Sequence, residues 1–299
     1  MRVVELSGGV GGARLARGLA ALPEIDLTVV VNVGDDCEIH GLHVSPDLDT
    51  VVYTLAGVEG PEGWGRAGDT FTANDELGRF GVDNRFRLGD RDLALNIFRT
   101  HRLSSGTPLS QVVAELAKSF GLGTRILPAT DDELRTEVRI DAGWVPFQEY
   151  FVIRQNRDEV MELAFRGADR AAPAPGVLDA IRDADLVVIA PSNPPLSVWP
   201  ILSVPGIRDA VAKHPRSLAV SPLFGGKALK GPADRVMRSL GLPPGNRGVA
   251  TAYDGLITTL VVDESDAEDD VPGIRTVATD TRFADPEAAR RFAEILVAL

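Results

Sequence analysis

A glycine-dense turn near the start of the chain constrains the fold more than any other feature of the sequence. Residues 3–6 are mostly apolar, as in a short buried strand, and residues 8–12 contain four glycines. Beyond them Ala13, Leu15 and Ala16 recur at helical spacing. This strand–turn–helix pattern is typical of α/β nucleotide-binding domains, because glycines permit the tight turn and the helix N-terminus attracts an anion such as phosphate.

The turn departs from the dinucleotide-binding fingerprint at two positions. Arg14 stands where the third glycine of Gly-x-Gly-x-x-Gly belongs, and the second predicted strand, residues 27–31, ends in Asn32 rather than in an acidic residue. These differences disfavour an NAD site and favour another nucleotide or phosphate ligand. A tight turn that binds no ligand is the alternative.

The length and charge of the chain limit its function class. Its 299 residues suit one large α/β domain or a domain with a subdomain. A net charge of −12 argues against a nucleic-acid-binding surface, but it leaves room for a phosphorylated ligand in a local pocket. No apolar run approaches a membrane span, and no signal-peptide pattern is present. The single cysteine, Cys37, excludes an intramolecular disulfide and fits a reducing cytoplasm.

Acidic residues gather after the second predicted strand. Asp35 and Asp36 follow it directly, and paired carboxylates at that edge of a parallel sheet are candidates to hold Mg²⁺. A helix is predicted to start soon afterwards, with Ser45 as its N-cap and with Asp47 and Asp49 in its first turn, where acids favour the helix dipole. A solvated turn and simple dipole stabilisation are the alternative explanations.

Two later loops are expected at the same edge of the sheet. Ser192 and Asn193 lie in a proline-rich loop after a buried strand and offer hydrogen bonds to a ligand. Gly226 and Lys227 belong to a second glycine–lysine loop, which is not a Walker A motif because Ala228 stands where Ser or Thr should follow the lysine. Several such loops on one edge predict a phosphorylated-nucleotide site with a divalent metal.

The middle of the chain changes character. Residues 136–140 and 147–153 have strand composition, so we expect a smaller inserted α+β subdomain over residues 124–165. Strands and helices alternate on either side of it, in residues 1–123 and 166–299. This alternation predicts a doubly wound, Rossmann-like α/β core with a mostly parallel sheet.

Some local features are also predicted. Asp90 is expected to cap the helix that follows it, and a closing helix is expected from Asp285. Residues 60–90, rich in Gly, Asp and Arg, are expected to form loops and short helices over the edge of the sheet. The acidic run 263–270 is expected to be a solvated loop.

In its motifs the sequence resembles the 2-phospho-L-lactate transferases, called CofD in archaea and FbiA in actinobacteria, which act in the synthesis of the deazaflavin coenzyme F-420. The matching stretches follow the family order over most of the chain. They are GGVGGAR at 8–14, VNVGDD at 31–36, SPDLDTVVYTLAG at 45–57, LGDRDLA at 88–94, PSNP at 191–194 and SP at 221–222.

The resemblance implies a reaction between two small molecules. The acceptor is Fo, a riboflavin-like deazaflavin, and the donor is a guanosine diphosphate joined to lactate or, in actinobacterial members, to enolpyruvate. The terminal ribityl hydroxyl of Fo attacks the phosphorus that bears the acid, and GMP leaves. Family members also suggest a homodimer.

The resemblance places the deazaflavin contacts at Asp49 and Arg87. We assign Mg²⁺ binding to Asp49 with Asp35 and Asp36 in support, and we expect Asp49 or Asp36 to orient or deprotonate the hydroxyl. Lys227 or Lys230 is expected to offset charge on the leaving phosphate. The expected donor site consists of Gly9, Gly11, Gly12, Ser192, Asn193, Gly226 and Lys227.

Two other functions stay open at this point. One is a sugar-nucleotide or dinucleotide enzyme, against which Arg14 and Asn32 count. The other is a non-catalytic nucleotide-binding regulator, since regulators of cell-wall metabolism share this fold. The stretches around Asp49 and Arg87 favour the transferase.

Overall fold

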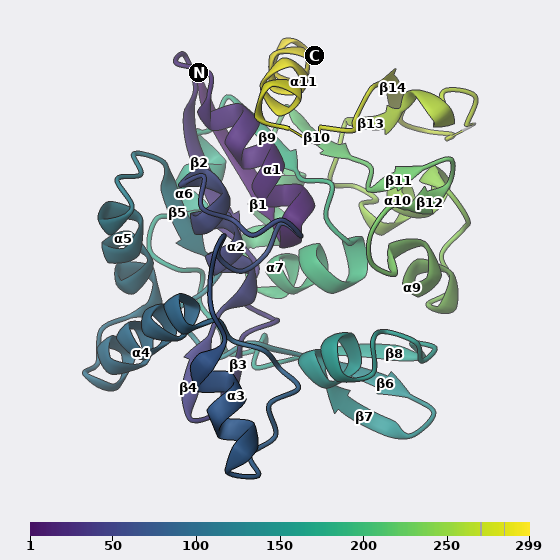
Figure 1. Cartoon of the computed structure of the whole chain (residues 1–299). Coiled ribbons are helices and arrows are strands. Elements are labelled where there is room, and N and C mark those ends of the chain that lie inside the picture. The colour runs from purple at the N-terminus through teal and green to yellow at the C-terminus, as the bar shows by residue number, and fades with distance from the viewer. Residues whose placement is uncertain (270, 284) are drawn as a thin grey trace.

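A seven-stranded parallel sheet forms the centre of the molecule (Figure 1). The computed structural model describes residues 1–269, 271–283 and 285–299. The strands of the sheet are β1 (Arg2–Ser7), β2 (Asp26–Val31), β5 (Arg125–Pro128), β9 (Leu186–Ile189), β10 (Ser217–Val220), β13 (Thr259–Asp263) and β14 (Arg275–Thr279).

The strand order is β14-β13-β10-β9-β1-β2-β5. From β1 the chain moves through β2 to β5 at one edge, and it then returns to the other side of β1 to build β9, β10, β13 and β14. The order therefore reverses between β1 and β9. In open α/β sheets, ligands bind beyond the carboxyl ends of the strands at such a switch point.

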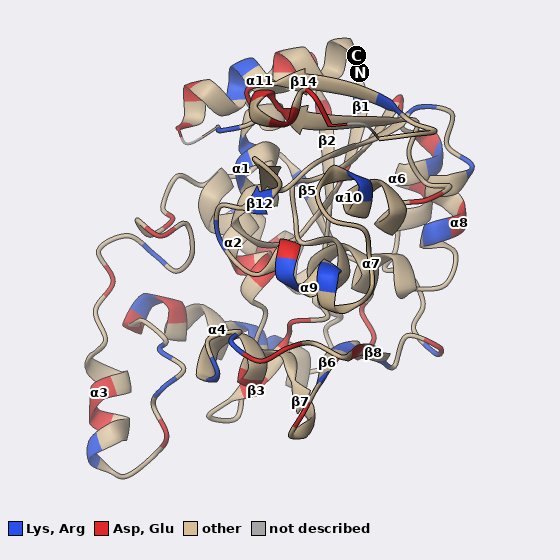
Figure 2. Ribbon diagram, turned by 90° about the vertical axis from the view of Figure 1, so that its right-hand side faces the viewer, with Lys and Arg blue, Asp and Glu red and all other residues tan. Residues whose placement is uncertain are grey.

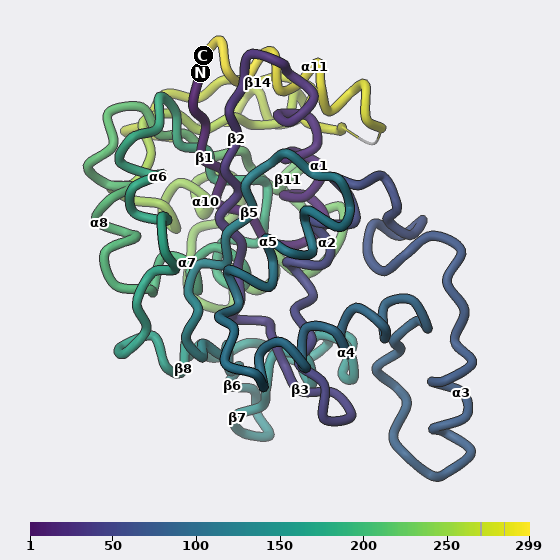
Figure 3. Tube along the Cα trace, turned by 90° about the vertical axis from the view of Figure 1, so that its left-hand side faces the viewer, coloured from purple at the N-terminus to yellow at the C-terminus, as the bar shows by residue number. Residues whose placement is uncertain are grey.

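Helices cover both faces of the sheet, which confirms the predicted doubly wound α/β fold. Figures 2 and 3, which view the molecule from opposite sides, show α1 and α2 on one side of the sheet and α6 and α8 on the other. The two termini lie side by side at one end. The helices are α1 (Gly9–Ala20), α2 (Pro46–Leu55), α3 (Thr72–Arg79), α4 (Asp90–Ser104), α5 (Leu109–Ser119), α6 (Val177–Asp183), α7 (Trp199–Ser203), α8 (Ile207–Ala212), α9 (Ala233–Ser239), α10 (Asn246–Ala252) and α11 (Pro286–Ala298).

Charged residues of both signs are interspersed along the outer helices (Figure 2). No helix in the described part of the chain is both long enough and apolar enough to cross a lipid bilayer.

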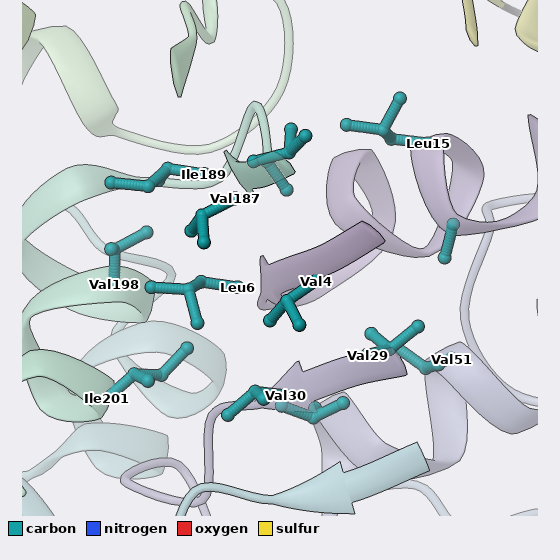
Figure 4. Close-up of a cluster of buried hydrophobic side chains, with 14 of the residues drawn as sticks. Val4, Leu6, Leu15, Val29, Val30, Val51, Val187, Ile189, Val198 and Ile201 are labelled. Carbon is teal, nitrogen blue, oxygen red and sulfur yellow. The ribbon is translucent and has the colours of Figure 1, made fainter. Parts of the chain in front are cut away.

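The inner strands are mostly apolar and almost entirely buried because both faces of the sheet are covered. Figure 4 shows Leu6 of β1 and Val30 of β2 among side chains that come from both helical layers. One layer contributes Val51 of α2 and the other contributes Ile201 of α7, and all four of these residues are fully buried. This packed centre fixes where the loops at the strand ends begin.

A smaller antiparallel sheet lies below the central one, as predicted for the inserted segment. It consists of β6 (Arg135–Ile140), β7 (Gly143–Pro146) and β8 (Glu162–Arg166), with β6 in the middle. Residues 125–128, which the predicted insertion 124–165 includes, instead pair with β2 in the central sheet. The division of the chain into domains otherwise stays a prediction.

The strand predicted over residues 147–153 is wrong. This segment contains the π-helical turn η1 (Glu149–Ile153), and β6 pairs with β7 instead. Phe147, Tyr150 and Phe151 recur at helical rather than alternating spacing, which places them on one side of the turn. The rings of Phe147 and Phe151 stack with centroids 5.2 Å apart.

The predicted cap at Asp90 belongs to a different helix. Asp90 is the first residue of α4, but its carboxylate accepts hydrogen bonds from the backbone N–H groups of Thr72 and Ala73, at 3.1 and 3.0 Å, in the first turn of α3. The first turn of α4 is capped in turn by the carboxylate of Asp69, which accepts the N–H of Arg91 at 2.9 Å. The N-cap position of α4 is Gly89, which has no side chain to do this.

The prediction of a solvated acidic loop over 263–270 is wrong for two of its members. Asp263 ends β13 and is buried, and its carboxylate accepts hydrogen bonds from Ser265 and Thr281. Asp266, in the short helical turn η3 (Glu264–Asp266), is also buried. Asp270 lies outside the described residues.

Candidate functional site

The loops that follow β1 and β9 meet at the switch point of the sheet. The backbone N–H of Gly8 donates to the Ser192 hydroxyl at 3.1 Å, and this hydroxyl donates to the carbonyl oxygen of Gly8 at 2.6 Å. Ser192 is buried. The structure therefore brings this predicted residue to the glycine turn, where it holds the turn in place.

The glycines of the turn serve different purposes. A Cβ on Gly11 would lie 2.6 Å from the carbonyl oxygen of Pro191, and a Cβ on Gly12 would lie 2.2 Å from the Ser7 hydroxyl. Gly9 differs, since it has a φ of +67° and a Cβ there would meet nothing within 4 Å. Of the three glycines of this turn that are predicted to bind the donor, Gly9 faces open space, whereas Gly11 and Gly12 are required by close packing of the chain.

An aspartate that was not assigned to the donor site lies at the N-terminus of α1. The backbone N–H of Gly9 donates to Asp47 Oδ1 at 2.8 Å. The side-chain amide of Asn32 donates both to Asp47 Oδ2 and to Asp35 Oδ1, each at 2.9 Å. Asn32 thus bridges two buried carboxylates, which explains why an amide stands where a dinucleotide site would have an acid. The signal for Asp47 was its place in the first turn of α2.

Burial is the main influence on these carboxylates. Desolvation raises the pKa of Asp47 to about 6, while the hydrogen bonds from Asn32 and from the Gly9 N–H oppose the shift. Desolvation also raises the pKa of Asp35, and the neighbouring charges of Asp47 and Asp36 raise it further. Positive charge arriving at this cluster would therefore be stabilised.

This cluster predicts a pH-dependent stability. The pKa of Asp47 is near 3.8 when the chain is unfolded and about 6 in the fold. Its contribution to the free energy of unfolding is therefore complete below pH 3.8 and is lost as the pH rises through about 6. In metal-free buffer, the stability advantage of the wild type over Asp47→Asn should shrink between these two pH values. Urea unfolding of both proteins across this range measures the difference.

Asp83→Asn is the control for this measurement. Asp83 is an exposed residue whose pKa is lowered to about 2, chiefly by hydrogen bonds from Arg85. The difference between this variant and the wild type should therefore stay constant over the same range. An equally constant difference for Asp47→Asn would contradict the assigned shift.

Asp36 is held by two side chains. Its Oδ2 accepts hydrogen bonds from the Ser45 hydroxyl at 2.7 Å and from His43 Nε2 at 2.9 Å. Within the described residues, its Oδ1 is buried without a hydrogen-bond partner. The predicted capping role of Ser45 is wrong, because its hydroxyl bonds to Asp36 and not to a backbone N–H of α2.

Asp49 has a different hydrogen-bond partner, although it is close enough to Asp36 for their charges to interact. Both of its oxygens accept hydrogen bonds from the guanidinium of Arg99, a fully buried residue of α4. Desolvation raises the pKa of Asp49 to about 7, and the charge of Arg99 limits the rise. Sequence reasoning missed Arg99, since the two residues are 50 positions apart.

Arg87 lies on the segment between α3 and α4, which projects from the body of the molecule (Figure 3). Its guanidinium stacks over the Phe71 ring at 4.2 Å and lies 3.6 Å from Asp75. Among the described residues, no hydrogen bond, ion pair or ring contact joins Arg87 to Asp49. Asp49 and Arg87, to which the resemblance assigns deazaflavin binding, therefore do not contact each other directly.

The predicted glycine–lysine loop is a tight hairpin turn. Gly226 lies between β11 (Leu223–Phe224) and β12 (Lys227–Ala228) with a φ of +72°. Lys230, just beyond, forms an ion pair with Glu62 at 3.2 Å. The neighbouring Gly63 is so close to the glycine turn that a Cβ there would lie 2.4 Å from Val10 Cγ1. The segment after the hairpin is thus connected to the glycine turn through Lys230, Glu62 and Gly63. Within the described residues, Lys227 makes no such connection.

Asn193 has a local structural role. Its side-chain oxygen accepts the backbone N–H of Leu196 at 3.2 Å and so caps the turn η2 (Pro194–Val198).

A second hairpin follows Asp36. It consists of β3 (Cys37–Ile39) and β4 (Leu42–Val44), and it carries His43.

Part of the predicted ligand set fits Mg²⁺. The described residues contain no group of three or more His, Cys, Asp or Glu side chains that could hold a metal ion. Mg²⁺, however, often takes only one or two protein carboxylates, with water and substrate phosphate oxygens completing its shell. Asp35 and Asp36 suit this role, since Asp36 Oδ1 is buried and unpartnered within the described residues. Asp49 suits it less well, because both of its oxygens already accept hydrogen bonds from Arg99.

Two cavities lie elsewhere in the molecule. One, of about 390 Å³, is lined by residues at the amino ends of β10 and β13, among them Ser217 and Thr259. The other, of about 260 Å³, lies between Tyr150 of η1 and Arg235 of α9. Neither is lined by a predicted site residue, so the convergence of loops at the switch point remains the structural basis of the site.

Comparisons with known proteins find similarity over nearly the whole chain. The family model described as 2-phospho-L-lactate transferase CofD matches residues 3–289. The chain is 42% identical to the phosphoenolpyruvate transferase of Thermobifida fusca, over 100% of this chain and 98% of that protein. It is 41% identical to the 2-phospho-L-lactate transferase of Methanopyrus kandleri, over 98% and 96%.

A solved structure shares the fold. It is a member of the UPF0052 family from Bacillus halodurans, with a TM-score of 0.66 over 99% of this chain and 98% of that one. The sequences are only 18% identical, so this similarity concerns the fold alone.

Proposed function

Because this chain belongs to the 2-phospho-L-lactate transferase CofD family and is therefore a transferase, we propose that it moves a phospholactyl or phosphoenolpyruvyl group onto the deazaflavin Fo. The donor is the corresponding guanosine diphosphate-linked acid, GMP is released, and the reaction depends on Mg²⁺. The names of the relatives support both acids, so both stay within the proposal.

One observation carries this proposal. Hydrogen bonds connect three segments at the switch point. The turn after β1 is joined to the loop after β9 by Gly8 and Ser192, and to the acidic loop after β2 through Asp47, which accepts from both Gly9 and Asn32. A diphosphate donor needs a site for its phosphate groups and, beside it, a site for the Mg²⁺ that neutralises their charge. Gly9 faces open space, and the Asp47 carboxylate that accepts its N–H is connected through Asn32 to Asp35, which supports this pairing.

The proposed chemistry is a displacement at phosphorus. The ribityl oxygen forms a bond to the phosphorus that bears the acid, the bond from this phosphorus to the GMP oxygen breaks, and GMP leaves with the bonding electrons. The hydroxyl proton passes to Asp49, whose pKa of about 7 suits a base at neutral pH. Asp35 and Asp36 would hold Mg²⁺, which when bound neutralises charge on the diphosphate.

We also propose a homodimer, which the family resemblance implies, and a cytoplasmic location, which the single cysteine fits.

Product analysis tests the proposal directly. The purified chain is incubated with Fo, Mg²⁺ and either the lactyl or the enolpyruvyl donor, and the products are separated by mass spectrometry. We expect one phosphodiester of Fo, together with an equal amount of GMP, and no product in excess EDTA. If a guanosine diphosphate donor binds but is never consumed, the chain is a nucleotide-binding regulator and the proposal is wrong.

A further inference from the structure

Arg99 is the one arginine in the described chain whose side chain is fully buried beside the proposed site. It lies in the middle of α4, and its guanidinium points to the first turn of α2, where both oxygens of Asp49 accept its hydrogen bonds. Nη1 also donates to Asn96 Oδ1 at 2.6 Å, one turn earlier in α4. A buried guanidinium is costly unless it is paired, so this contact is built into the fold.

The contact constrains Asp49 in a specific way. A guanidinium presents two parallel N–H groups in a rigid plane, which match the two oxygens of a carboxylate and fix its rotation. Within the described residues no other side chain forms a hydrogen bond to Asp49. The nearby acid Asp92 is instead bonded to the Tyr53 hydroxyl at 2.7 Å. The orientation of Asp49 therefore depends on Arg99.

Asn96 in turn restrains Arg99. Its side-chain oxygen takes one N–H of the guanidinium, and its own amide donates to the carbonyl oxygen of Asp92 at 2.9 Å within α4. The backbone carbonyl of His43, from β4, lies 3.4 Å from the same Nη1. The guanidinium is thus held by α4, by α2 and by the hairpin that carries the Asp36 partner.

We propose that Arg99 is a positioning residue, which aims the carboxylate of Asp49 at the hydroxyl of the acceptor. This inference rests on the proposed function, because the acceptor is taken to be Fo. Arg99 itself touches no substrate. Its loss should therefore impair the transfer step and leave binding of the guanosine diphosphate donor largely intact.

Kinetics of three variants test this role. Arg99→Met removes the two parallel N–H groups of the guanidinium and keeps most of the side-chain volume. Arg99→Lys keeps a positive charge but cannot form the paired hydrogen bonds. We expect kcat to fall by about 100-fold for Arg99→Met, the scale on which small misplacements of a reacting group act, with the donor KM changed less than about threefold. Arg99→Lys should recover about tenfold, because the charge is kept and the orientation is not. Asn96→Ala should show a smaller loss of kcat in the same direction.

Arg102→Met is the matched control. Arg102 lies one turn further along α4 and forms a two-pronged ion pair with Glu115 at 2.9 and 2.7 Å, away from Asp49. Its removal should leave kcat and both KM values unchanged.

The outcomes separate the two proposals. If the wild type forms no product with Fo, the proposed function fails and this inference fails with it. If the wild type is active and folded Arg99→Met retains its kcat, only the positioning role is overturned. Should Arg99→Met not fold, Arg99→Lys and Asn96→Ala decide. A wild-type kcat in both, or a fall in kcat that matches the unfolded fraction of each variant, would show a purely structural role.

Discussion

Asp49→Asn is expected to lower kcat for transfer to Fo by about 1,000-fold, within the range found when a general base is removed. Asparagine keeps the shape of the side chain and can still accept a hydrogen bond from Arg99, but it cannot take the proton of the attacking hydroxyl. The KM for the guanosine diphosphate donor should change little, because this donor is expected at Gly9 and the Asp35–Asp36 pair.

The pH profile sharpens this prediction. Burial raises the pKa of Asp49 to about 7, so the wild-type kcat should rise with pH through this value as the carboxylate loses its proton. The residual activity of Asp49→Asn should lack this rise. Rapid-quench kinetics over this range, with the folded fraction measured in each sample, provide the comparison.

Asp92→Asn is a suitable control for Asp49→Asn. Asp92 is a partly buried neighbour on α4 whose pKa is also raised by burial, yet its carboxylate is bonded to the Tyr53 hydroxyl. It should retain kcat within a few-fold of the wild type. Similar losses in both variants would mean that the effect comes from disturbed packing and not from proton transfer.

The parts of the fold that could be predicted from the sequence depend on local signals. The closing helix is one such part, since Asp285 accepts the N–H of Ala288 at 2.8 Å at the start of α11, as expected for a cap. The strand–turn–helix at the head of the chain is another. In both cases the apolar spacing and the residues at the ends are contained in one short stretch.

The arrangement of the site depended on contacts between distant stretches, which no local pattern contains. Asn32 was only a departure from a known fingerprint until its amide was found between Asp35 and Asp47. Gln148 shows the same limitation, because its side chain donates to the backbone carbonyl of Asp35 at 2.9 Å from the inserted segment, 113 positions away. Polar residues of this kind acquire their partners only when the sheets are packed.

The sequence also does not show why each glycine is required. A glycine can be needed for a positive φ, for a ligand or for another piece of chain, and the sequence does not distinguish these cases. In the site, Gly9 takes a positive φ and Gly11 makes room for the backbone of Pro191. Gly18, two turns further along α1, allows the backbone of helix α11 to pack closely against α1.

Gly18→Ala is expected to reduce the free energy of unfolding by about 2 kcal/mol, despite the better helix propensity of alanine. A Cβ at this position would lie 2.3 Å from the carbonyl oxygen of Ala289 and 2.6 Å from its carbonyl carbon. Both atoms belong to the backbone of α11, so no side-chain rotation relieves the collision. The two helices must move apart, which opens the packing between α1 and the C-terminal helix.

Gly123→Ala separates this collision from the general effect of adding a methyl group. Gly123 lies in the loop before β5, where a Cβ would meet nothing within 4 Å and the backbone has no positive φ. Its stability should therefore stay the same or rise slightly, because alanine restricts the unfolded chain. Urea unfolding should give a lower midpoint with an unchanged slope for Gly18→Ala only. A Gly18→Ala protein as stable as Gly123→Ala would show that α11 does not pack on α1 as closely as described.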